Sequence, residues 1–330
     1  MSILIAALPI LALILAANLI AARGGERGRI IFNLSLFVAN LILLIAGIGL
    51  RFLPPDALAM PEMGLQLLDQ GLGSATLIGM GLWGMLVSLK PARQWLGRVL
   101  PSLDPESPVH TLALMIVGYL MGNAAFSVSP GALDALAEAG IEATLFDVLA
   151  QQFVFVLAAF LGVGLLTRRD GTALNERLGL QRPTRPQIWT GIRWMLFFVI
   201  LQSCIGATWA LFDAAGVEQL SGINESLLGD FDTVWEWFLL AAGAGLGEEL
   251  LFRGAMQPIF GILTTSLIFA VSHVQYGLTP ATLVVFLLSV VLGIIRKRSN
   301  TTVAILVHAG YNFILGLMSL LAIYLESFVR

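Results

Sequence analysis

The amino-acid sequence predicts an all-α protein, a polytopic bundle of about ten transmembrane helices. Of its 330 residues, 58% are hydrophobic and only 12% are charged, whereas a soluble domain is about half apolar and about a quarter charged. Long apolar runs recur along the whole chain, and the segments that separate them alternate between basic and non-basic. Lipid must therefore be the solvent for much of the surface, which predicts a multi-pass integral membrane protein.

The predicted spans are apolar runs of about 18 residues or more, the length that crosses the hydrocarbon core of a bilayer. Pro and Gly do not disqualify a run, because membrane helices tolerate both. The first run precedes its basic residues, the reverse of a secretory signal, so we expect it to be retained as a helix. The ten runs are residues 2–22, 30–50, 71–89, 108–128, 146–167, 188–211, 234–255, 258–275, 278–295 and 301–325.

The connecting segments predict how the helices are oriented. Lys and Arg gather in one set of segments, residues 23–29, 90–107, 168–187 and 296–298. The segments between these are mainly acidic, residues 51–70, 129–145 and 212–233. Basic loops stay on the cytosolic side, and consecutive spans must alternate. We therefore expect both termini outside, and the compact loops favour a bacterial inner membrane.

Ionisable residues divide the chain into two transmembrane parts. The first five predicted spans hold almost none in their cores, whereas the last five hold nearly all of them. We therefore predict an N-terminal extension of about five helices over residues 1–167. A basic cytosolic linker follows over 168–187, and a transmembrane domain with the functional site covers 188–330.

Two residues with reactive side chains are expected to be structural. Cys204 is the single cysteine and lies inside an apolar run. One cysteine allows no disulfide within the chain and no Cys-based metal site, so we expect a small buried hydrophobic residue. His110 follows Pro108 at a predicted helix start, which indicates an interfacial histidine.

The first candidate site is a charged cluster at the inner end of the span 234–255. A charge at membrane depth costs at least a few kcal/mol, so it requires a partner or a function. Glu249 and Arg253 are four residues apart in the favourable order, so they share a helix face and can neutralise each other. Glu248 points about 100° away and has no local partner, which suits a general base. The alternative is a glutamate pair that closes the helix end at the cytosolic interface.

Small residues precede this cluster, and two histidine clusters follow it. Residues 241–245 have almost no side chains, so another helix can approach closely. Phe269 and His273 are one turn apart, and so are His308 and Asn312. Taken alone, these indicate a helix-end histidine and a polar pair that holds helices together. Because all the clusters fall in neighbouring hydrophobic segments, one shared polar site is the simplest interpretation.

The ordered motifs Glu-Glu-x-x-x-Arg, Phe-x-x-x-His and His-x-x-x-Asn resemble those of the CPBP family. This family contains the type II CAAX prenyl endopeptidases together with bacterial Abi and bacteriocin-processing or immunity relatives. The resemblance covers about residues 175–325, and the chain departs from the pattern at no motif position. It implies a membrane-embedded endopeptidase, an intramembrane protease that hydrolyses a peptide bond near the cytosolic face.

The resemblance also implies a role for each motif residue. Glu248 would activate the attacking water with help from His273, and two donors would stabilise the oxyanion of the tetrahedral intermediate, His308 and Asn312. Three further residues would support the site: Glu249, Arg253 and Phe269. A glutamate base, a histidine helper and fixed donors are what amide hydrolysis requires.

Metal dependence stays open at this point. Glu248, His273 and His308 could together hold zinc, with water in the fourth position. The order of residues is not His-Glu-x-x-His, and no second carboxylate replaces Glu248 as the base unless Glu249 leaves Arg253. We therefore expect no obligatory cofactor, and we keep a divalent metal such as zinc as the alternative.

Helix geometry allows the expected depths of Glu248, His308 and His273 in the membrane to be compared. At about 1.5 Å per residue, Glu248 lies about 8 Å deeper than Arg253, and His308 lies about 10 Å deeper than the start of its span. His273 follows Pro258 by 15 residues, which would place it about 20 Å deep. A common site therefore requires that the first helix runs on past Arg253, or that the next helix tilts or begins deep.

Two other functions remain compatible with the sequence. A transporter with a polar midplane site would show broken helices and matching halves, which are not evident. A non-catalytic scaffold for bacteriocin immunity or phage defence could keep the same motifs, since fold does not imply function. The expected partners are membrane lipids and a peptide or protein substrate, with no nucleic acid. A CAAX substrate needs a prenylated C-terminal Cys, so in a bacterium the CAAX label would name the family rather than the reaction.

Overall fold

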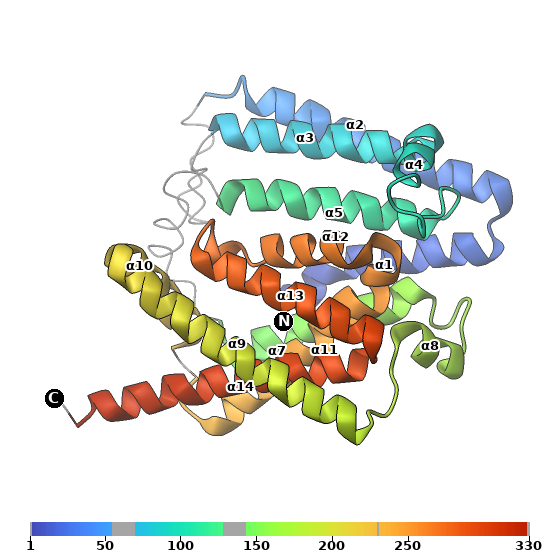
Figure 1. Ribbon diagram of the computed structural model, residues 1–330. Helices are drawn as coiled ribbons and strands as arrows, with labels where there is room; N and C mark the ends of the chain where they lie inside the picture. Colours follow the sequence, from blue (N-terminus) through green and yellow to red (C-terminus); the bar gives the residue numbers. More distant parts are fainter. Residues whose placement is uncertain (1, 55–69, 128–142, 230, 329–330) are drawn as a thin grey trace. The chain divides into compact units, whose positions relative to one another are not determined.

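The computed structural model describes residues 2–54, 70–127, 143–229 and 231–328, and over these ranges the chain is helical without a β-strand, as the sequence predicts. Figure 1 shows the helices. They are α1 (Ser2–Arg23), α2 (Gly25–Leu50), α3 (Gln70–Ser88), α4 (Lys90–Leu96), α5 (Pro108–Ser127), α7 (Leu145–Val163), α8 (Gly171–Leu178), α9 (Arg185–Phe212), α10 (Ala214–Leu228), α11 (Val234–Glu249), the π-helix η3 (Leu250–Met256), α12 (Gln257–Ser272), the 3-10 helix η4 (Val274–Tyr276), α13 (Pro280–Arg298) and α14 (Thr301–Glu326). Much of the predicted loops 51–70 and 129–145 lies outside the described residues.

Nine helical stretches of the described chain are long and apolar enough to cross a membrane, where the sequence predicts about ten. The difference arises at the predicted spans 234–255 and 258–275, which form one stretch of 39 residues, Val234–Ser272. A straight helix of this length would measure about 58 Å, nearly twice the hydrocarbon core. The backbone breaks at Gly261, where φ is 76° and ψ is 175°, a conformation open mainly to glycine. The helix therefore runs on past Arg253 before it breaks.

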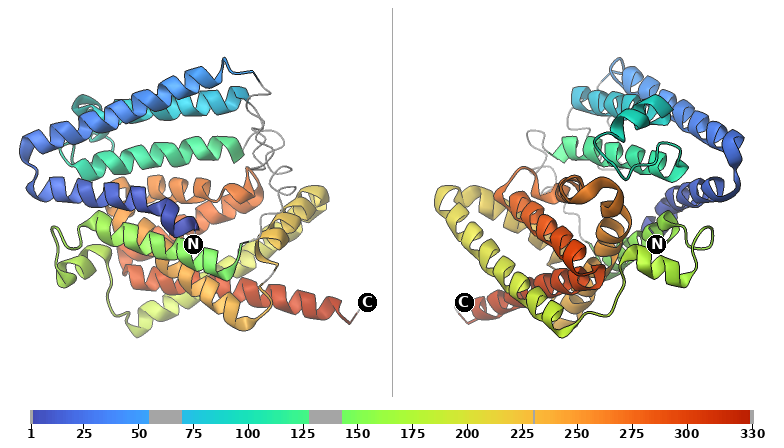
Figure 2. Two further views of the ribbon diagram at one scale, coloured as in Figure 1. Left: turned by 180° about the vertical axis from the view of Figure 1, so that it is seen from behind. Right: turned by 45° about the vertical axis from the view of Figure 1, so that its right-hand side comes forward.

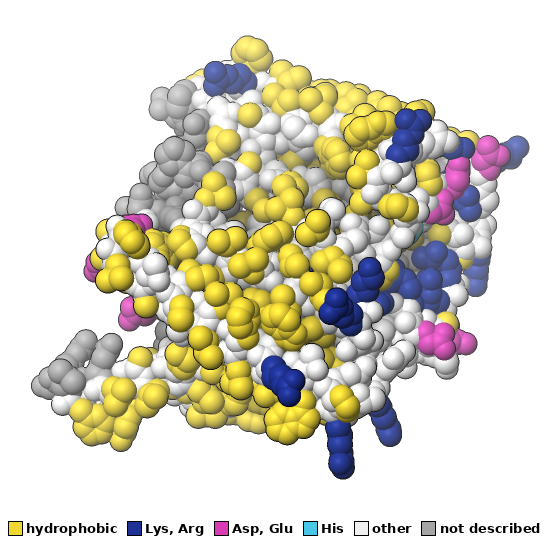
Figure 3. Space-filling model, viewed as in Figure 1, with side chains coloured by type: hydrophobic (Ala, Val, Ile, Leu, Met, Phe, Trp, Pro, Cys, Tyr) yellow, Lys and Arg dark blue, Asp and Glu magenta, His cyan; other side chains and the backbone are white. Residues whose placement is uncertain are grey.

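The surface of helix α9 is consistent with a lipid environment. Large hydrophobic side chains along this helix are exposed, among them Trp189, Phe197 and Ile200, and hydrophobic side chains dominate the face seen in Figure 3. Soluble proteins rarely expose contiguous apolar surface of this kind. Cys204 also lies exposed on α9, so the prediction that it is buried is wrong. An apolar run in a membrane helix does not distinguish a lipid-facing position from a packed one.

The chain divides into two compact units. Unit 1 comprises Met1–Leu15, Ile141–Ala270 and Thr279–Arg330, and unit 2 comprises Ala16–Gly140 and Val271–Leu278. In this division α7 lies in unit 1 with α9, α11 and α14. The predicted boundary between an N-terminal extension and a functional domain stays a prediction. Helix propensity and hydropathy are local and carry no information about which helices pack together.

Within unit 2, helix α3 packs against α2 and α5 (Figure 2), and a hydrogen bond to a buried asparagine of α2 links α2 to α5. Asn40 is fully buried and accepts a hydrogen bond of 2.6 Å from the hydroxyl of Tyr119. A side chain at Gly84 would collide with Asn40. Small residues and interhelical hydrogen bonds are typical of helix packing in membranes, so this contact holds the unit together.

Within unit 1, helix α11 packs against α7 and α14, and α14 packs against α9. A capping box fixes the start of α11, since Thr233 and Glu236 each bond the other's backbone N–H. The side chain of Asn300 accepts a bond of 2.9 Å from the N–H of Val303 at the start of α14. These caps fix the residues at which α11 and α14 begin, and these two helices carry most of the candidate site.

The basic segment predicted as a linker, residues 168–187, lies within unit 1. It contains α8, and Arg177 on this helix donates to the carbonyl oxygens of Gly254 and Ala255 at 2.5 and 3.0 Å. Burial, and secondarily neighbouring arginine charges, lower the pKa of Arg177 to about 10. The guanidinium therefore stays charged at neutral pH and ties the linker to the end of the π-helix.

Candidate active site

Two glycines bring helices close to the end of α11, where the adjacent glutamates lie. A Cβ atom at Gly245 would lie 2.8 Å from the Cβ atom of Ala309 on α14. A Cβ atom at Gly247 would lie 2.5 Å from Oε1 of Gln152 on α7. The close helix approach predicted from residues 241–245 is therefore present at Gly245. The π-helix η3 follows at once, and such segments frequently occur at functional sites.

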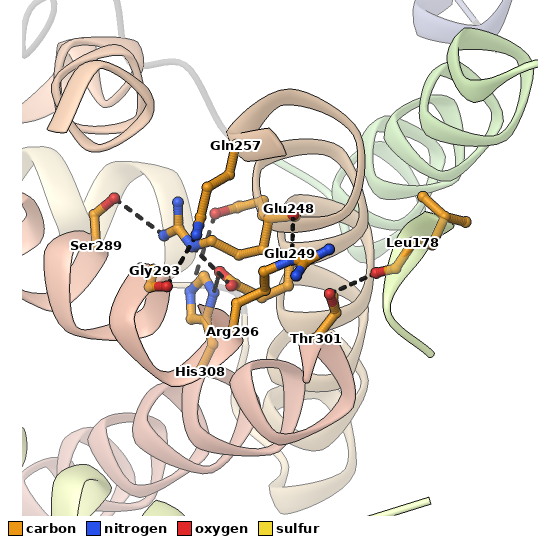
Figure 4. A network of polar contacts seen from close by, with 10 residues as sticks. Leu178, Glu248, Glu249, Gln257, Ser289, Gly293, Arg296, Thr301 and His308 are labelled. Atoms are coloured by element: carbon orange, nitrogen blue, oxygen red, sulfur yellow. Dashed lines mark hydrogen bonds and ion pairs between the residues drawn. The ribbon is translucent and has the colours of Figure 1, made fainter. Parts of the chain in front are cut away.

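Glu249, which is labelled in Figure 4, forms with Arg253 the ion pair that their spacing predicts. Oε2 of Glu249 lies 3.0 Å from Nε of Arg253, and neither side chain has exposed surface. Nη2 of Arg253 also donates to Oγ of Ser289 on α13 at 3.0 Å. The guanidinium lies 5.0 Å from the ring centroid of Phe269 on α12, a cation–π contact. Four helical segments therefore meet at Arg253.

His308 on α14 completes this buried group. Its Nδ1 atom lies 3.0 Å from Oε1 of Glu249, and its Nε2 atom lies 4.0 Å from Oε2 of Glu248. The rings of His308 and Phe269 make an edge-to-face contact, with their centroids 5.9 Å apart. Because an ionised carboxylate only accepts hydrogen bonds, Nδ1 carries a proton and Nε2 is left facing Glu248. Glu249 thus fixes the orientation of the His308 ring, with Nδ1 as the hydrogen-bond donor.

Glu248 is more accessible than its neighbour, with 13% of its side chain exposed against 0% for Glu249. Its Oε1 atom accepts a hydrogen bond of 3.3 Å from Nε2 of Gln152. Its Oε2 atom is buried and has no hydrogen-bond partner among the residues that the structure describes. Since a hydrogen bond to water spans about 2.8 Å, one water molecule can bond both this oxygen and Nε2 of His308.

Gln152 is not among the site residues predicted from the sequence, because those were mainly ionisable side chains. Gln151 and Gln152 interrupt the apolar span 146–167, and a buried amide requires a partner as a charge does. That signal was present, but the identity of the partner depends on how α7 packs against α11.

Asn312 lies one turn after His308 on α14, as predicted. Its side chain is partly buried and makes no hydrogen bond to any residue within the described ranges. It is therefore not part of a polar pair that holds described helices together. The predicted role as an oxyanion donor stays a prediction.

His273 follows the last residue of α12 and precedes η4. Its ring stacks on Tyr276, with centroids 5.9 Å apart and planes inclined by 15°. The segment Val271–Leu278 belongs to unit 2, whereas Glu248 and His308 belong to unit 1. The predicted part of His273 in catalysis stays a prediction. The third histidine, His110, accepts a bond of 2.9 Å from the N–H of Asp104 near the start of α5.

The donor atoms of unit 1 do not by themselves make the zinc site that the sequence leaves open as an alternative. Nδ1 of His308 is occupied by Glu249, which is itself paired with Arg253. This leaves Glu248 and Nε2 of His308, whereas a catalytic zinc site uses three protein ligands. No group of three or more metal-binding side chains is found in the described part of the chain.

Comparison with known proteins bears on the helices that carry this site. Residues 230–314 match the model of a protein family described as type II CAAX prenyl endopeptidase Rce1-like. The match includes Glu248, Glu249 and Arg253 as well as both later motifs, and a family of endopeptidases supports peptidase chemistry in general. No curated protein and no solved structure matches the chain. Residues 230–314 are therefore similar to the type II CAAX prenyl endopeptidases, a match that supports membership of the CPBP family.

Proposed function

We propose that this protein is an intramembrane endopeptidase that hydrolyses a peptide bond near the cytosolic face of the membrane. The observation that carries the proposal is the separation of 4.0 Å between Oε2 of Glu248 and Nε2 of His308. The other oxygen of Glu248 and the other nitrogen of His308 are both held by buried partners. A carboxylate and an imidazole aimed at one point are suited to activate water and to stabilise the charge that its attack creates.

In the proposed reaction, Glu248 removes a proton from the water as its oxygen attacks the carbonyl carbon of the substrate. Negative charge then develops on the carbonyl oxygen. His308 in its doubly protonated form donates to this oxygen from Nε2, and the amide of Asn312 is the proposed second donor. The carboxylate of Glu249 at Nδ1 stabilises the positive ring. Glu248 finally transfers its proton to the departing amine, which restores the site.

The proposed position near the cytosol rests on the basic end of α13. Nε of Arg296 donates to the carbonyl oxygen of Arg253 at 3.2 Å, and residues 296–298 are Arg-Lys-Arg. Because basic segments remain on the cytosolic side, the helix end next to the glutamates would face the cytosol. We propose the bacterial inner membrane as the location, and there a substrate need carry no prenyl group.

The test compares protein termini in membranes of cells that naturally carry this chain. The gene is deleted, and the wild type, Glu248→Gln, His308→Ala or Glu218→Gln is restored at equal abundance; Glu218 lies exposed on α10. New peptide termini are then identified by mass spectrometry. We expect termini that appear with the wild type and with Glu218→Gln but are lost with the two site variants.

Cleavage by Glu248→Gln at the wild-type rate would overturn the proposed mechanism. An absence of any terminus that depends on Glu248 would overturn the peptidase itself and favour the non-catalytic scaffold. A prenylated CAAX peptide, added to the purified protein in lipid vesicles, then decides whether a prenyl group is recognised.

A further inference from the structure

Gln152 contributes to the candidate site from outside the segment that matches the endopeptidase family. It lies on α7, 96 residues before Glu248, and the family match begins only at residue 230. The side chain is buried, with 6% of the residue exposed. Its Nε2 atom donates to Oε1 of Glu248 at 3.3 Å.

Two glycines, one turn apart on α11, make room for Gln152. A Cβ atom at Gly247 would lie 2.5 Å from its Oε1 atom and 2.8 Å from its backbone oxygen. A Cβ atom at Gly243 would lie 3.7 Å from its Cγ atom. Because the backbone of α11 confines the amide on this side, Gln152 has little freedom to turn away from Glu248.

The contact decides how the carboxylate of Glu248 is aimed. With Oε1 held by the amide of Gln152, Oε2 is the oxygen that lies 4.0 Å from Nε2 of His308. A hydrogen bond to a carboxylate favours its ionised form, which is the form that accepts a proton from water. A buried glutamine that served only to join two helices could use any acceptor, whereas this one uses the proposed base.

We infer that Gln152 is a positioning residue that holds the carboxylate of Glu248 directed at His308, an inference that rests on the proposed role of Glu248. Helix α7 is then a required part of the site rather than part of an accessory extension. The competing interpretation is that Gln152 only joins α7 to α11.

The test follows the loss of the Gln152 contact through the chemical reactivity of the Glu248 carboxyl group and needs no substrate. Dicyclohexylcarbodiimide reacts with protonated carboxyl groups in apolar surroundings, and mass spectrometry of the digested protein locates the adduct. The full-length protein in lipid vesicles is labelled over a range of pH. The variants are Gln152→Met, which keeps the shape but removes the donor, and Gln152→Asn, which stays polar but is too short. The matched control is Gln151→Met, because Gln151 is exposed on the same helix.

We expect labelling of Glu248 at neutral pH to rise about tenfold in both Gln152 variants, the change expected when a hydrogen bond to a charged group is lost. The excess should disappear in acid, where the carboxyl is protonated in every variant. Gln151→Met should behave as the wild type. A merely looser packing would raise labelling by the same factor at every pH, and this result or unchanged labelling in both folded variants would overturn the inference.

The labelling result and the search for new termini can fail separately. If termini depend on Glu248 while labelling does not respond to Gln152, the protein is a peptidase and Gln152 only joins helices. If labelling responds but no terminus depends on Glu248, the contact with Gln152 stands and the proposed peptidase fails.

Discussion

The Nδ1 atom of His308 lies 3.0 Å from Oε1 of Glu249, whose second oxygen lies 3.0 Å from Nε of Arg253. One fully buried carboxylate therefore holds a histidine from α14 and an arginine from the following turn. The adjacent glutamate, Glu248, is left for a different partner. The two glutamates thus have separate tasks because neighbouring residues of a helix point about 100° apart.

Removing the arginine of the buried pair should strongly destabilise the protein. Arg253→Met leaves the charge of Glu249 buried without its partner, which costs about 3–5 kcal/mol. The double variant Glu249→Gln, Arg253→Met should recover most of this loss, because no uncompensated charge remains. Thermal unfolding followed by tryptophan fluorescence in detergent measures both. Arg98→Met, at an exposed position, is the control; an equal loss in the single and double variants would contradict the expectation.

The close approach of α11 to α14 should make Gly245 intolerant of the smallest side chain. In Gly245→Ala the added carbon would lie 2.8 Å from Cβ and 2.9 Å from the backbone nitrogen of Ala309. The helices must then separate, at a cost of about 1–3 kcal/mol. Gly206→Ala in α9 is the matched control, since nothing lies within 4 Å of its added carbon. If the unfolding midpoints of Gly245→Ala and Gly206→Ala differ by less than the experimental error, the close approach of α11 to α14 does not contribute to stability.

Asn312 should matter for the reaction more than for stability. Its side chain makes no hydrogen bond within the described residues, so Asn312→Ala should leave the unfolding midpoint nearly unchanged. Loss of one oxyanion donor should lower kcat by about 10²–10³-fold. The rate is measured on a peptide that spans a cleavage site found in the comparison of termini, with Asn224→Ala on α10 as the control. A lower unfolding temperature with an unchanged kcat would instead assign Asn312 to helix packing.

Chelation should leave cleavage largely intact. Within unit 1, the donors left for a metal are Glu248 and one nitrogen of His308, and two ligands are too few for a catalytic zinc site. We expect purified protein dialysed against 1,10-phenanthroline to keep its rate within about twofold, a margin that corresponds to less than about 0.5 kcal/mol. Loss of the rate, followed by its recovery when zinc is added back, would contradict this expectation and establish a metal enzyme.

The sequence by itself determined that the chain is helical and membrane-embedded, because composition and the length of apolar runs are properties of the chain alone. It also determined the pairing of Glu249 with Arg253, since residues four apart on a helix meet whatever surrounds them. The depth predicted for His273 allowed a common site only if the first helix runs on past Arg253, or if the next helix tilts or begins deep. The structure contains the first of these, because the π-helix η3 ends at Met256 and α12 continues from there to the break at Gly261.

Only the tertiary structure decided which distant side chains complete the site. His308 is 59 residues from Glu249, and Gln152 is 96 residues from Glu248. No helical periodicity relates such positions. Their contacts depend on Gly245 and Gly247, which allow α14 and α7 to approach α11 on different sides. Spacing along one helix predicts that Glu249, and not Glu248, pairs with Arg253. Helix packing then brings Gln152 to Glu248 and His308 to Glu249.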